Sequence, residues 1–246
     1  AQSMHGVPKI LIVDWDVHHG NGTQHAFLSD PSVLFISLHQ DNLFPIDSGG
    51  KDETGTGPGK GFTVNLPLPA GTGNRGYQEA FDRVVIPIAR QFDPDLVFIS
   101  AGQDASVQDP LGRMCLTVAG YRMMMEKLQA VAAETCGGRI VVAQEGGYSP
   151  TYAPYCSATI AHTLAGDLAA DLEPPRDPYG ARSDALPPTH VLGLDVERAL
   201  DQLFAERGIV GRPLGVLSGA SAALTKLDSS VYPAITVSSA PAGTEM

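Results

Sequence analysis

The chain has 246 residues, enough to bury a full hydrophobic core as one α/β domain. Its composition, 43% hydrophobic and 17% charged, excludes wholesale disorder, and its net charge of −11 disfavours direct binding to nucleic acid. No apolar run approaches the roughly 20 residues of a membrane span, so no membrane association is expected. The three cysteines lack CxxC spacing, which indicates a reducing compartment and a cytoplasmic protein.

Short apolar runs rich in β-branched residues predict buried parallel strands at 9–14, 33–38, 95–101 and 139–144. Helical patterns are predicted at 74–92, with a kink at Pro87, at 117–134, with Thr117 as N-cap, and at 151–165. Strands alternating with helices predict an α/β fold with a parallel sheet and right-handed crossovers. The Gly-rich segment 41–61 is predicted to be a long functional loop.

The character of the sequence changes after residue 166. Residues 167–190 are rich in proline and are predicted to be a linker. A short amphipathic helix is predicted at 191–207, with Val196, Leu200, Leu203 and Phe204 on one face. Residues 208–246 are expected to form a poorly ordered tail.

Polar side chains follow each of the four predicted strands, in the stretches DWDVHHGNG, SLHQD, SAGQDASVQDPLG and QEGGYSP. Ligands of open α/β sheets bind at this end of the strands. Asp16 and His18 lie two apart in extended chain, so they share a face and can bind one ion, with Asp14 one pleat deeper. Asp104 is a candidate third ligand, and such a set suits catalytic zinc or iron(II).

Each motif also has a simpler interpretation. An isolated DxH pair is a weak signal for metal, and Asp14 and Asp104 are equally suited to capping a helix or turn. The DPLG stretch around Asp109 is typical of a turn, and EGGYS fits a flexible turn with Tyr148 half-buried. Five further histidines are expected to pack in the core or face solvent: His5, His25, His39, His162 and His190.

Together the four stretches resemble the zinc-dependent histone deacetylase family, most closely its class II-like bacterial branch, which includes acetylpolyamine amidohydrolases. The resemblance runs from about residue 5 to 166. It implies an arginase/deacetylase-like three-layer α/β fold with a central, mainly parallel sheet, and makes residues 1–166 the C-terminal part of a deacetylase domain. The implied activity is zinc-dependent removal of acetyl or other acyl groups from lysine side chains.

The resemblance implies roles for individual residues. Asp16, His18 and Asp104 would bind Zn²⁺, with Fe²⁺ as the alternative ion, and Tyr148 would donate a hydrogen bond to the developing oxyanion. An inner structural K⁺ site would use Asp14, Ser37 and the backbone around Asp16, His18 and Leu38. An outer K⁺ site would use the backbone carbonyls of Phe27, Asp30, Val33 and Phe62. The acyl-lysine tunnel would be lined by Phe44, Leu111, Gly146 and Gly147.

Two of these residues bear on the substrate. Relatives with His in place of Tyr148 are weak on acetyl-lysine, and Leu111 stands where polyamine-selective relatives carry a gatekeeping Glu. Tyr148 thus implies a competent electrophilic half of the site, and Leu111 favours an acetylated lysine peptide or protein over an acetylpolyamine. A catalytically silent metal-binding relative is the alternative from another class. An arginase-like di-manganese enzyme is disfavoured, because that chemistry needs more carboxylates than these motifs supply.

The family's general base is one of an adjacent His-His pair in a GHHA context, which this sequence lacks. His18–His19 is no substitute, because His18 is expected to bind zinc and His19 to face the other way. A fragment, an incomplete gene model and a degenerate relative are the three explanations, and the intact zinc-site residues favour a truncated chain with impaired catalysis. Loss of strands would uncover a sheet edge, so we expect low stability or association, such as a homo-oligomer.

Overall fold

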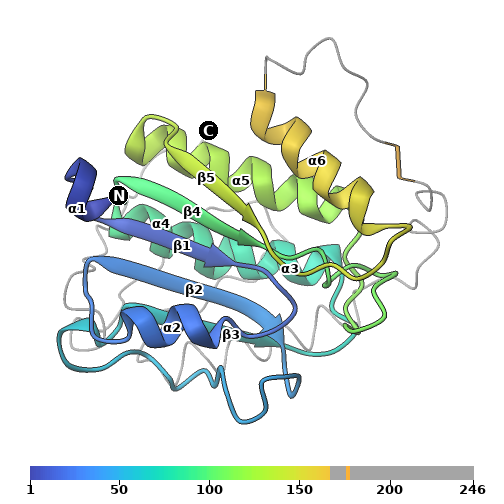
Figure 1. The fold of residues 1–246 in the computed structure, drawn as a ribbon, viewed down its shortest axis with the longest axis horizontal. Helices are drawn as coiled ribbons and strands as arrows, with labels where there is room; N and C mark the ends of the chain where they lie inside the picture. Colours follow the sequence, from blue (N-terminus) through green and yellow to red (C-terminus); the bar gives the residue numbers. More distant parts are fainter. Residues whose placement is uncertain (167–175, 178–246) are drawn as a thin grey trace, which may run out of the picture.

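The computed structural model describes residues 1–166 and 176–177. At its centre lies a five-stranded sheet in the order β3-β2-β1-β4-β5, in which every neighbouring pair is parallel (Figure 1). The strands are β1 Ile10–Asp14, β2 Val33–Gln40, β3 Thr63–Leu68, β4 Leu96–Ala101 and β5 Ile140–Gln144. The predicted parallel sheet is therefore confirmed. The predicted linker, helix and tail after residue 166 lie outside the described residues, apart from 176 and 177.

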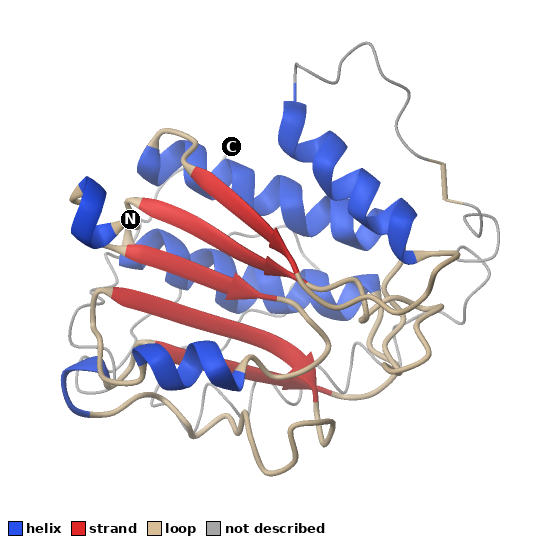
Figure 2. Cartoon of the chain, in the orientation of Figure 1, coloured by secondary structure: helices blue, strands red, loops and turns tan. Residues whose placement is uncertain are grey.

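Helices cover the two faces of the sheet unequally. The helical segments are α1 Gln2–His5, α2 Asn21–Phe27, the 3₁₀ turn η1 Gly57–Gly59, α3 Asn74–Ala80, the π-helical turn η2 Phe81–Val85, α4 Ile86–Phe92, α5 Val118–Cys136 and α6 Ala153–Ala165. α3, α4 and α5 lie on one face, with α6 packed against α5, while α2 lies on the other (Figures 1 and 2). The molecule thus has three layers. No helix in the described part of the chain is both long and apolar enough to cross a bilayer.

Alternation along the strands divides the apolar residues between the two faces. Leu11 and Val13 of β1 belong to the main core under α3, α4 and α5, whereas Ile12 belongs to a smaller cluster with Val33 and Phe35 on the α2 side. Fully burying one such side chain contributes about 1.5–3 kcal/mol. Packing on both sides of β1 therefore fixes where its carboxyl end points.

Four elements were not predicted: the short α1 and η1, and also β3 and α2. β3 contains Pro67, which argues against a strand in the middle of a sheet, but β3 is an edge strand and pairs only with β2 among the described residues. α2 begins with Asn21-Gly22, a dipeptide typical of turns, and buries only Gln24. Its helical pattern was too short to recognise against that turn signal.

The helix predicted over 74–92 forms, but as α3, a π-helical turn and α4 in succession rather than as one kinked helix. Pro87 has no N–H to donate, and the wider turn at Phe81–Val85 ends two residues before it. Thr117 occupies the predicted N-cap of α5 but makes no capping bond with its side chain. Its hydroxyl instead accepts a hydrogen bond from Asn74 Nδ2 at 2.8 Å.

β5 forms the other edge of the sheet. In the part of the chain that the structure describes, it pairs with β4 alone, and Val141, its second residue, is 45% exposed. Val141 stands opposite Phe98 of β4, on the face that carries α2 rather than the long helices. β5 is therefore an exposed edge among the described residues, and whether it results from lost strands stays a prediction.

Candidate metal centre

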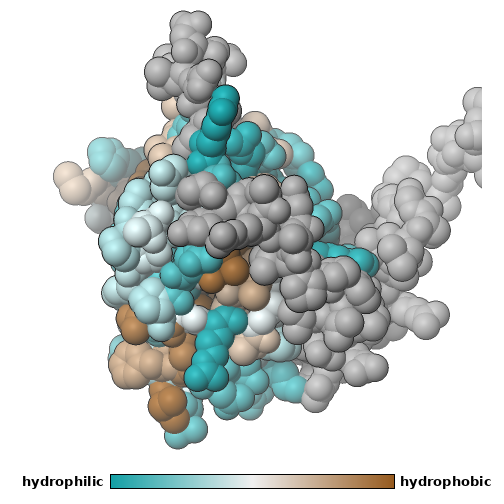
Figure 3. Space-filling model, turned by 90° about the vertical axis from the view of Figure 1, so that its right-hand side faces the viewer, coloured by the Kyte–Doolittle hydropathy of each residue, from teal (hydrophilic) through white to brown (hydrophobic). Residues whose placement is uncertain are grey.

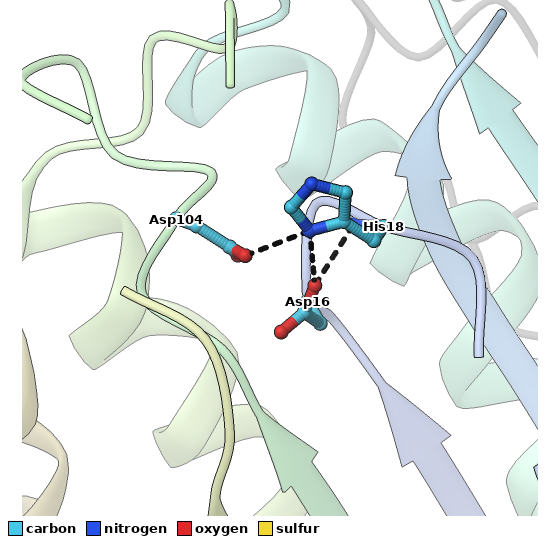
Figure 4. Close-up of side chains that lie close together, drawn as sticks. All are labelled: Asp16, His18 and Asp104. Carbon is cyan, nitrogen blue, oxygen red and sulfur yellow. Dashed lines mark hydrogen bonds and ion pairs between the residues drawn. The ribbon is translucent and has the colours of Figure 1, made fainter. Parts of the chain in front are cut away.

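Three side chains meet at the carboxyl ends of two neighbouring strands. Asp16 and His18 follow β1, and Asp104 follows β4, which is hydrogen-bonded to β1. His18 Nδ1 lies 3.0 Å from Asp16 Oδ1 and 3.0 Å from Asp104 Oδ2 (Figure 4). One ligand atom from each residue lies within 4.8 Å of the other two. The structure therefore brings together the three residues predicted to bind metal.

The donor set fits a catalytic divalent ion. One imidazole nitrogen and two carboxylate oxygens are ligands that zinc accepts, and three protein ligands leave a fourth position for water or substrate. With metal–ligand bonds of about 2.0–2.1 Å, ligand atoms around tetrahedral zinc lie about 3.3 Å apart. The separations of 3.0 Å between His18 Nδ1 and the two carboxylates are close to that value.

Backbone amides hold the three side chains in place. The amide of Asp16 donates to Asp14 Oδ1 at 3.0 Å, and the amide of His18 donates to Asp16 Oδ1 at 2.9 Å. The amide of Val17 donates to Asp104 Oδ1 at 2.8 Å, which joins the segment after β1 to the loop after β4. Each carboxylate is oriented by the chain itself, as is usual around metal ligands.

Two glycines allow the backbone to approach the carboxylates closely. A Cβ atom on Gly102 would lie 2.4 Å from Asp16 Oδ2, and one on Gly146 would lie 2.2 Å from Asp104 Oδ2. The amide of Gly146 also donates to Asp16 Oδ2 at 2.9 Å. Gly147 lies beside Gln103, with φ of 136°. Gly146, predicted as a tunnel residue, therefore contacts the candidate ligands directly.

Electrostatics at the site favour a bound cation. Hydrogen bonds with Asp104 and Asp16 raise the pKa of His18 to about 10, so an imidazolium sits between two carboxylates when no metal does. Burial raises the pKa of Asp104 to about 6. Burial also acts to raise the pKa of Asp16, but hydrogen bonds from His18 hold it below its ordinary value. Burial, followed by the charge of Asp16, raises the pKa of Asp14 well above its ordinary range.

Tyr148 stands beside the three candidate ligands. Its ring is 50% exposed and meets the His18 ring edge-on, with centroids 6.3 Å apart. Its backbone amide donates to Asp109 Oδ2 at 2.7 Å. The other oxygen of Asp109 accepts from the amide of Leu111 at 2.8 Å, so the predicted turn at DPLG forms. The second contact of Asp109, to Tyr148, was missed, because nothing in a turn motif indicates a partner so far along the chain.

Large apolar side chains are exposed at the same end of the sheet. Figure 3 looks toward the carboxyl ends of the strands and shows hydrophobic side chains on that surface. Phe44 and Leu111, both predicted to line a substrate tunnel, are 69% and 52% exposed. Ile46 is 69% exposed as well and was not predicted. Its only sequence signal is its place in the short apolar stretch LFPI of a loop that is mostly polar.

The residues expected at the two potassium sites are divided between the two faces of the sheet: Phe27 and Val33 belong to the cluster on the α2 side, whereas Leu38 and Phe62 belong to the main core. Asp14 and Ser37 are buried and face each other in the β1–β2 register, and Leu38 follows Ser37 in β2. The outer set surrounds the turn from α2 into β2 and the start of β3: Phe27, Asp30, Val33 and Phe62. The carbonyls of Phe27 and Phe62 already accept backbone hydrogen bonds, which leaves each one further lone pair. Binding of potassium there stays a prediction.

Two histidines are buried away from the candidate ligands. His39, expected to pack or to face solvent, is packed, and its ring bonds Ser37 Oγ and the carbonyl of Gly49. His19 turns to the opposite side from His18, as expected, and bonds Ser48 and Gln24. His19 and His39 lie 4.8 Å apart between ring centroids.

Known proteins similar to this chain agree with its geometry. The family model described as histone deacetylase domain matches residues 1–164. The chain is 47% identical over 171 residues to a probable deacetylase of Archaeoglobus fulgidus, and 42% identical over 177 residues to a histone deacetylase-like amidohydrolase of Pseudomonas aeruginosa. These matches cover 69% and 72% of this chain and 47% of each relative. The chain thus spans about half the length of the curated relatives it matches.

A solved structure extends the similarity to the fold. The structure of the histone deacetylase Clr3 matches with a TM-score of 0.66 and 36% sequence identity. The match covers 82% of this chain and 33% of that one. The predicted arginase/deacetylase-like architecture is confirmed by this likeness.

Proposed function

Because the chain belongs to the histone deacetylase family, we propose that it contributes the metal-binding part of a zinc-dependent amide hydrolase acting on acyl-lysine side chains. The observation that carries this proposal is the convergence of Asp16, His18 and Asp104 on one point, with Tyr148 beside them. The substrate is an acetylated lysine peptide or protein. Its acyl-lysine chain would enter past the exposed Phe44 and Leu111.

One oxygen of Asp16, Nδ1 of His18 and one oxygen of Asp104 would hold the ion. Zinc at this position would supply Lewis acidity toward the amide carbonyl and toward a bound water. Burial and the charges of Asp104 and Asp16 raise the pKa of Tyr148, which keeps its phenol protonated at neutral pH. The Tyr148 hydroxyl then donates a hydrogen bond to the oxyanion as negative charge develops on it.

The proton of the attacking water needs an acceptor, and the sequence has one adjacent histidine pair, His18–His19. His18 faces the two carboxylates, and both ring nitrogens of His19 are engaged elsewhere. The proposal therefore assigns the general base to neither His18 nor His19 and expects slow turnover from the chain on its own.

We also propose a structural K⁺ beside Asp14. This carboxyl is 3% exposed, and its pKa is raised mainly by burial and by the nearby Asp16. A monovalent cation between Asp14 and Ser37 would keep the carboxylate ionised and oriented toward the amide of Asp16. Removal of K⁺ is expected to weaken zinc binding indirectly.

The test compares two substrates and one variant. Zinc-loaded protein is expected to hydrolyse an acetyl-lysine peptide faster than acetylputrescine. Tyr148→Phe keeps the ring and removes the hydroxyl, and it should lower turnover about 10²–10³-fold without changing zinc content. Faster hydrolysis of acetylputrescine would identify a polyamine enzyme instead. Zinc binding with turnover equal to that of Tyr148→Phe would identify a silent metal-binding protein.

A further inference from the structure

A buried hydrogen-bond network lies next to the metal centre and uses none of the candidate ligands. Its side chains come from five places in the chain: His19 after β1, Gln24 of α2, His39 of β2, Asn65 of β3, and Ser48 with Glu53 in the loop between β2 and β3. Four of these six, His19, Gln24, His39 and Asn65, are buried polar residues. Such a network rigidifies its surroundings when every member finds a partner.

The direction of each bond in the network can be worked out from donor and acceptor chemistry. A carboxylate only accepts, so the Gln24 amide must turn its Nε2 toward Glu53 Oε2, 2.5 Å away. Gln24 Oε1 then accepts from Asn65 Nδ2 at 2.7 Å and from His19 Nε2 at 3.0 Å. His19 therefore carries its proton on Nε2, and its Nδ1 accepts from the Ser48 hydroxyl at 2.6 Å.

The same network ties down the backbone of residues 48–53. His39 Nε2 donates to the carbonyl of Gly49 at 3.0 Å, and Asn65 Nδ2 also approaches the carbonyl of Gly50 at 3.3 Å. The amide of Gly50 donates to Glu53 Oε1 at 2.6 Å. A Cβ atom on Gly49 would lie 2.5 Å from the His39 ring and 2.7 Å from the His19 ring. The backbone at Gly49 thus packs directly against the rings of His19 and His39.

The backbone stretch 48–53 that the network holds follows directly after residues 41–47, here called the rim, which carry two exposed apolar side chains. Phe44 and Ile46 precede Ser48, and both are exposed at the end of the sheet where the metal centre lies. A cavity of about 300 Å³ is lined by rim residues such as Leu43 and Ile46 and by network residues such as His39 and Glu53. Leu43 packs against the main core, whereas Phe44 and Ile46 are exposed, so little packing fixes the two apolar side chains of this loop. The stretch 48–53, held by the network, is the nearest anchored backbone along the chain.

We propose that Gln24, Glu53 and Asn65 are positioning residues that hold the 41–47 rim over the metal centre, with Phe44 and Ile46 as an apolar wall for the substrate's acyl-lysine chain. The role of the wall rests on the proposed function, whereas the anchoring of the loop does not. The controlling feature is the order of donors and acceptors from Glu53 through Gln24 to His19. Exchanging acid for amide, or amide for acid, at only one of positions 24 and 53 should release the loop. Exchanging both should restore it.

Exchange of the two functional groups tests this order. In Gln24→Glu two carboxylates face each other, and in Glu53→Gln two amides compete as donors. Each single variant should raise hydrogen–deuterium exchange of peptides from 41–53 by at least about tenfold, as expected for losing a charge-assisted hydrogen bond. The double variant restores every partner, because Gln at 53 can donate to Glu at 24 while its carbonyl accepts from Gly50. Its exchange should return to within about threefold of the wild type.

Controls separate the anchor from general destabilisation. Asp52→Asn makes the same change from acid to amide at the exposed neighbouring position and should leave exchange of 41–53 unchanged. Peptides from α5 should exchange at the wild-type rate in all variants. Single variants that exchange like the wild type, or a double variant that exchanges as fast as the singles, would overturn the proposal.

Activity provides a second readout. With an acetyl-lysine peptide, the single variants should raise KM about tenfold, leave kcat within about threefold and leave zinc content unchanged, and the double variant should restore KM. A loss of kcat with unchanged KM would contradict a role at the rim. If no variant and no wild-type sample hydrolyses the peptide, the proposed function fails, while the exchange experiment still decides whether the anchor exists.

Discussion

Gly146 shows how little space surrounds the candidate metal centre. A methyl group at this position would lie 2.2 Å from Asp104 Oδ2 and 2.6 Å from Asp16 Oδ2. Gly146→Ala is therefore expected to weaken zinc binding by about 10–100-fold, the usual effect of disturbing groups that orient metal ligands. Competition with a zinc chelator measures the change. Gly22→Ala in α2, where an added Cβ meets no atom within 4 Å, is the control and should bind zinc as the wild type does.

His18 makes metal binding depend on pH in a predictable direction. Its pKa is raised from 6.5 to about 10 by its two carboxylate partners, so the metal-free site holds a proton where the metal would bind. The stability that this imidazolium contributes is fully present below about pH 6.5 and is lost as pH rises through about 10. Metal must displace the proton, so zinc affinity should rise about tenfold per pH unit between these values.

Zinc competition titrations between pH 6.5 and 8.5, corrected for the chelator's own protonation, check this slope. His25→Asn removes an exposed histidine of α2 and should not alter it. A zinc affinity that stays constant over this range would mean that no proton sits between Asp16 and Asp104 in the metal-free protein.

For single residues, the sequence was sufficient to predict positions fixed by a nearby strand, but not contacts between loops far apart in the chain. Asp16 and His18 are two apart after a clear strand, and Asp104 follows another, so their approach at one edge of the sheet could be predicted, whereas Asp104, a candidate by position, was assigned as third ligand by the family resemblance. The bond from Gly146 to Asp16 spans 130 residues, and the bond from Tyr148 to Asp109 spans 39. Such contacts depend on loop conformation, which strand periodicity does not determine.

Asn74 joins the beginnings of α3 and α5. Its Nδ2 donates to Thr117 Oγ1 at 2.8 Å, and its Oδ1 accepts from the amide of Thr117 at 3.0 Å. Asn74→Ala removes both bonds and leaves the first turn of α5 without this partner, so unfolding free energy should fall by about 1–3 kcal/mol. Urea denaturation measures it. Arg75→Ala, one position along the same helix, is the control and should cost less than about 0.5 kcal/mol.

Elements with a strong apolar pattern were predicted, and those shaped by their neighbours were not. β1, β2, β4 and β5 are continuous apolar runs, and α5 repeats apolar residues over 19 residues. β3 carries a proline that only its edge position tolerates, and α2 opens with a turn dipeptide. The N-cap of α5 could be placed at Thr117, but its partner is 43 residues away and left no local signal.

The open edge of β5 has a consequence for the whole molecule. Val141 is 45% exposed on a strand with one partner among the described residues, and such edges favour pairing between chains. The protein is therefore expected to self-associate at micromolar concentrations, and Val141→Lys should shift it toward the monomer. Sedimentation velocity distinguishes the species. Met4→Lys introduces the same charge at a residue that is 84% exposed in α1 and should leave association unchanged.

The account depends most directly on Asp16, His18 and Asp104 forming one metal site. The measurement that tests this is the zinc content of the purified 246-residue chain, by elemental analysis after dialysis, for the wild type and for Asp104→Ala. The account predicts about one zinc per wild-type chain and near zero for Asp104→Ala, with both proteins folded by circular dichroism. A folded wild type without zinc, or an Asp104→Ala variant that retains it, would contradict the assignment of this site.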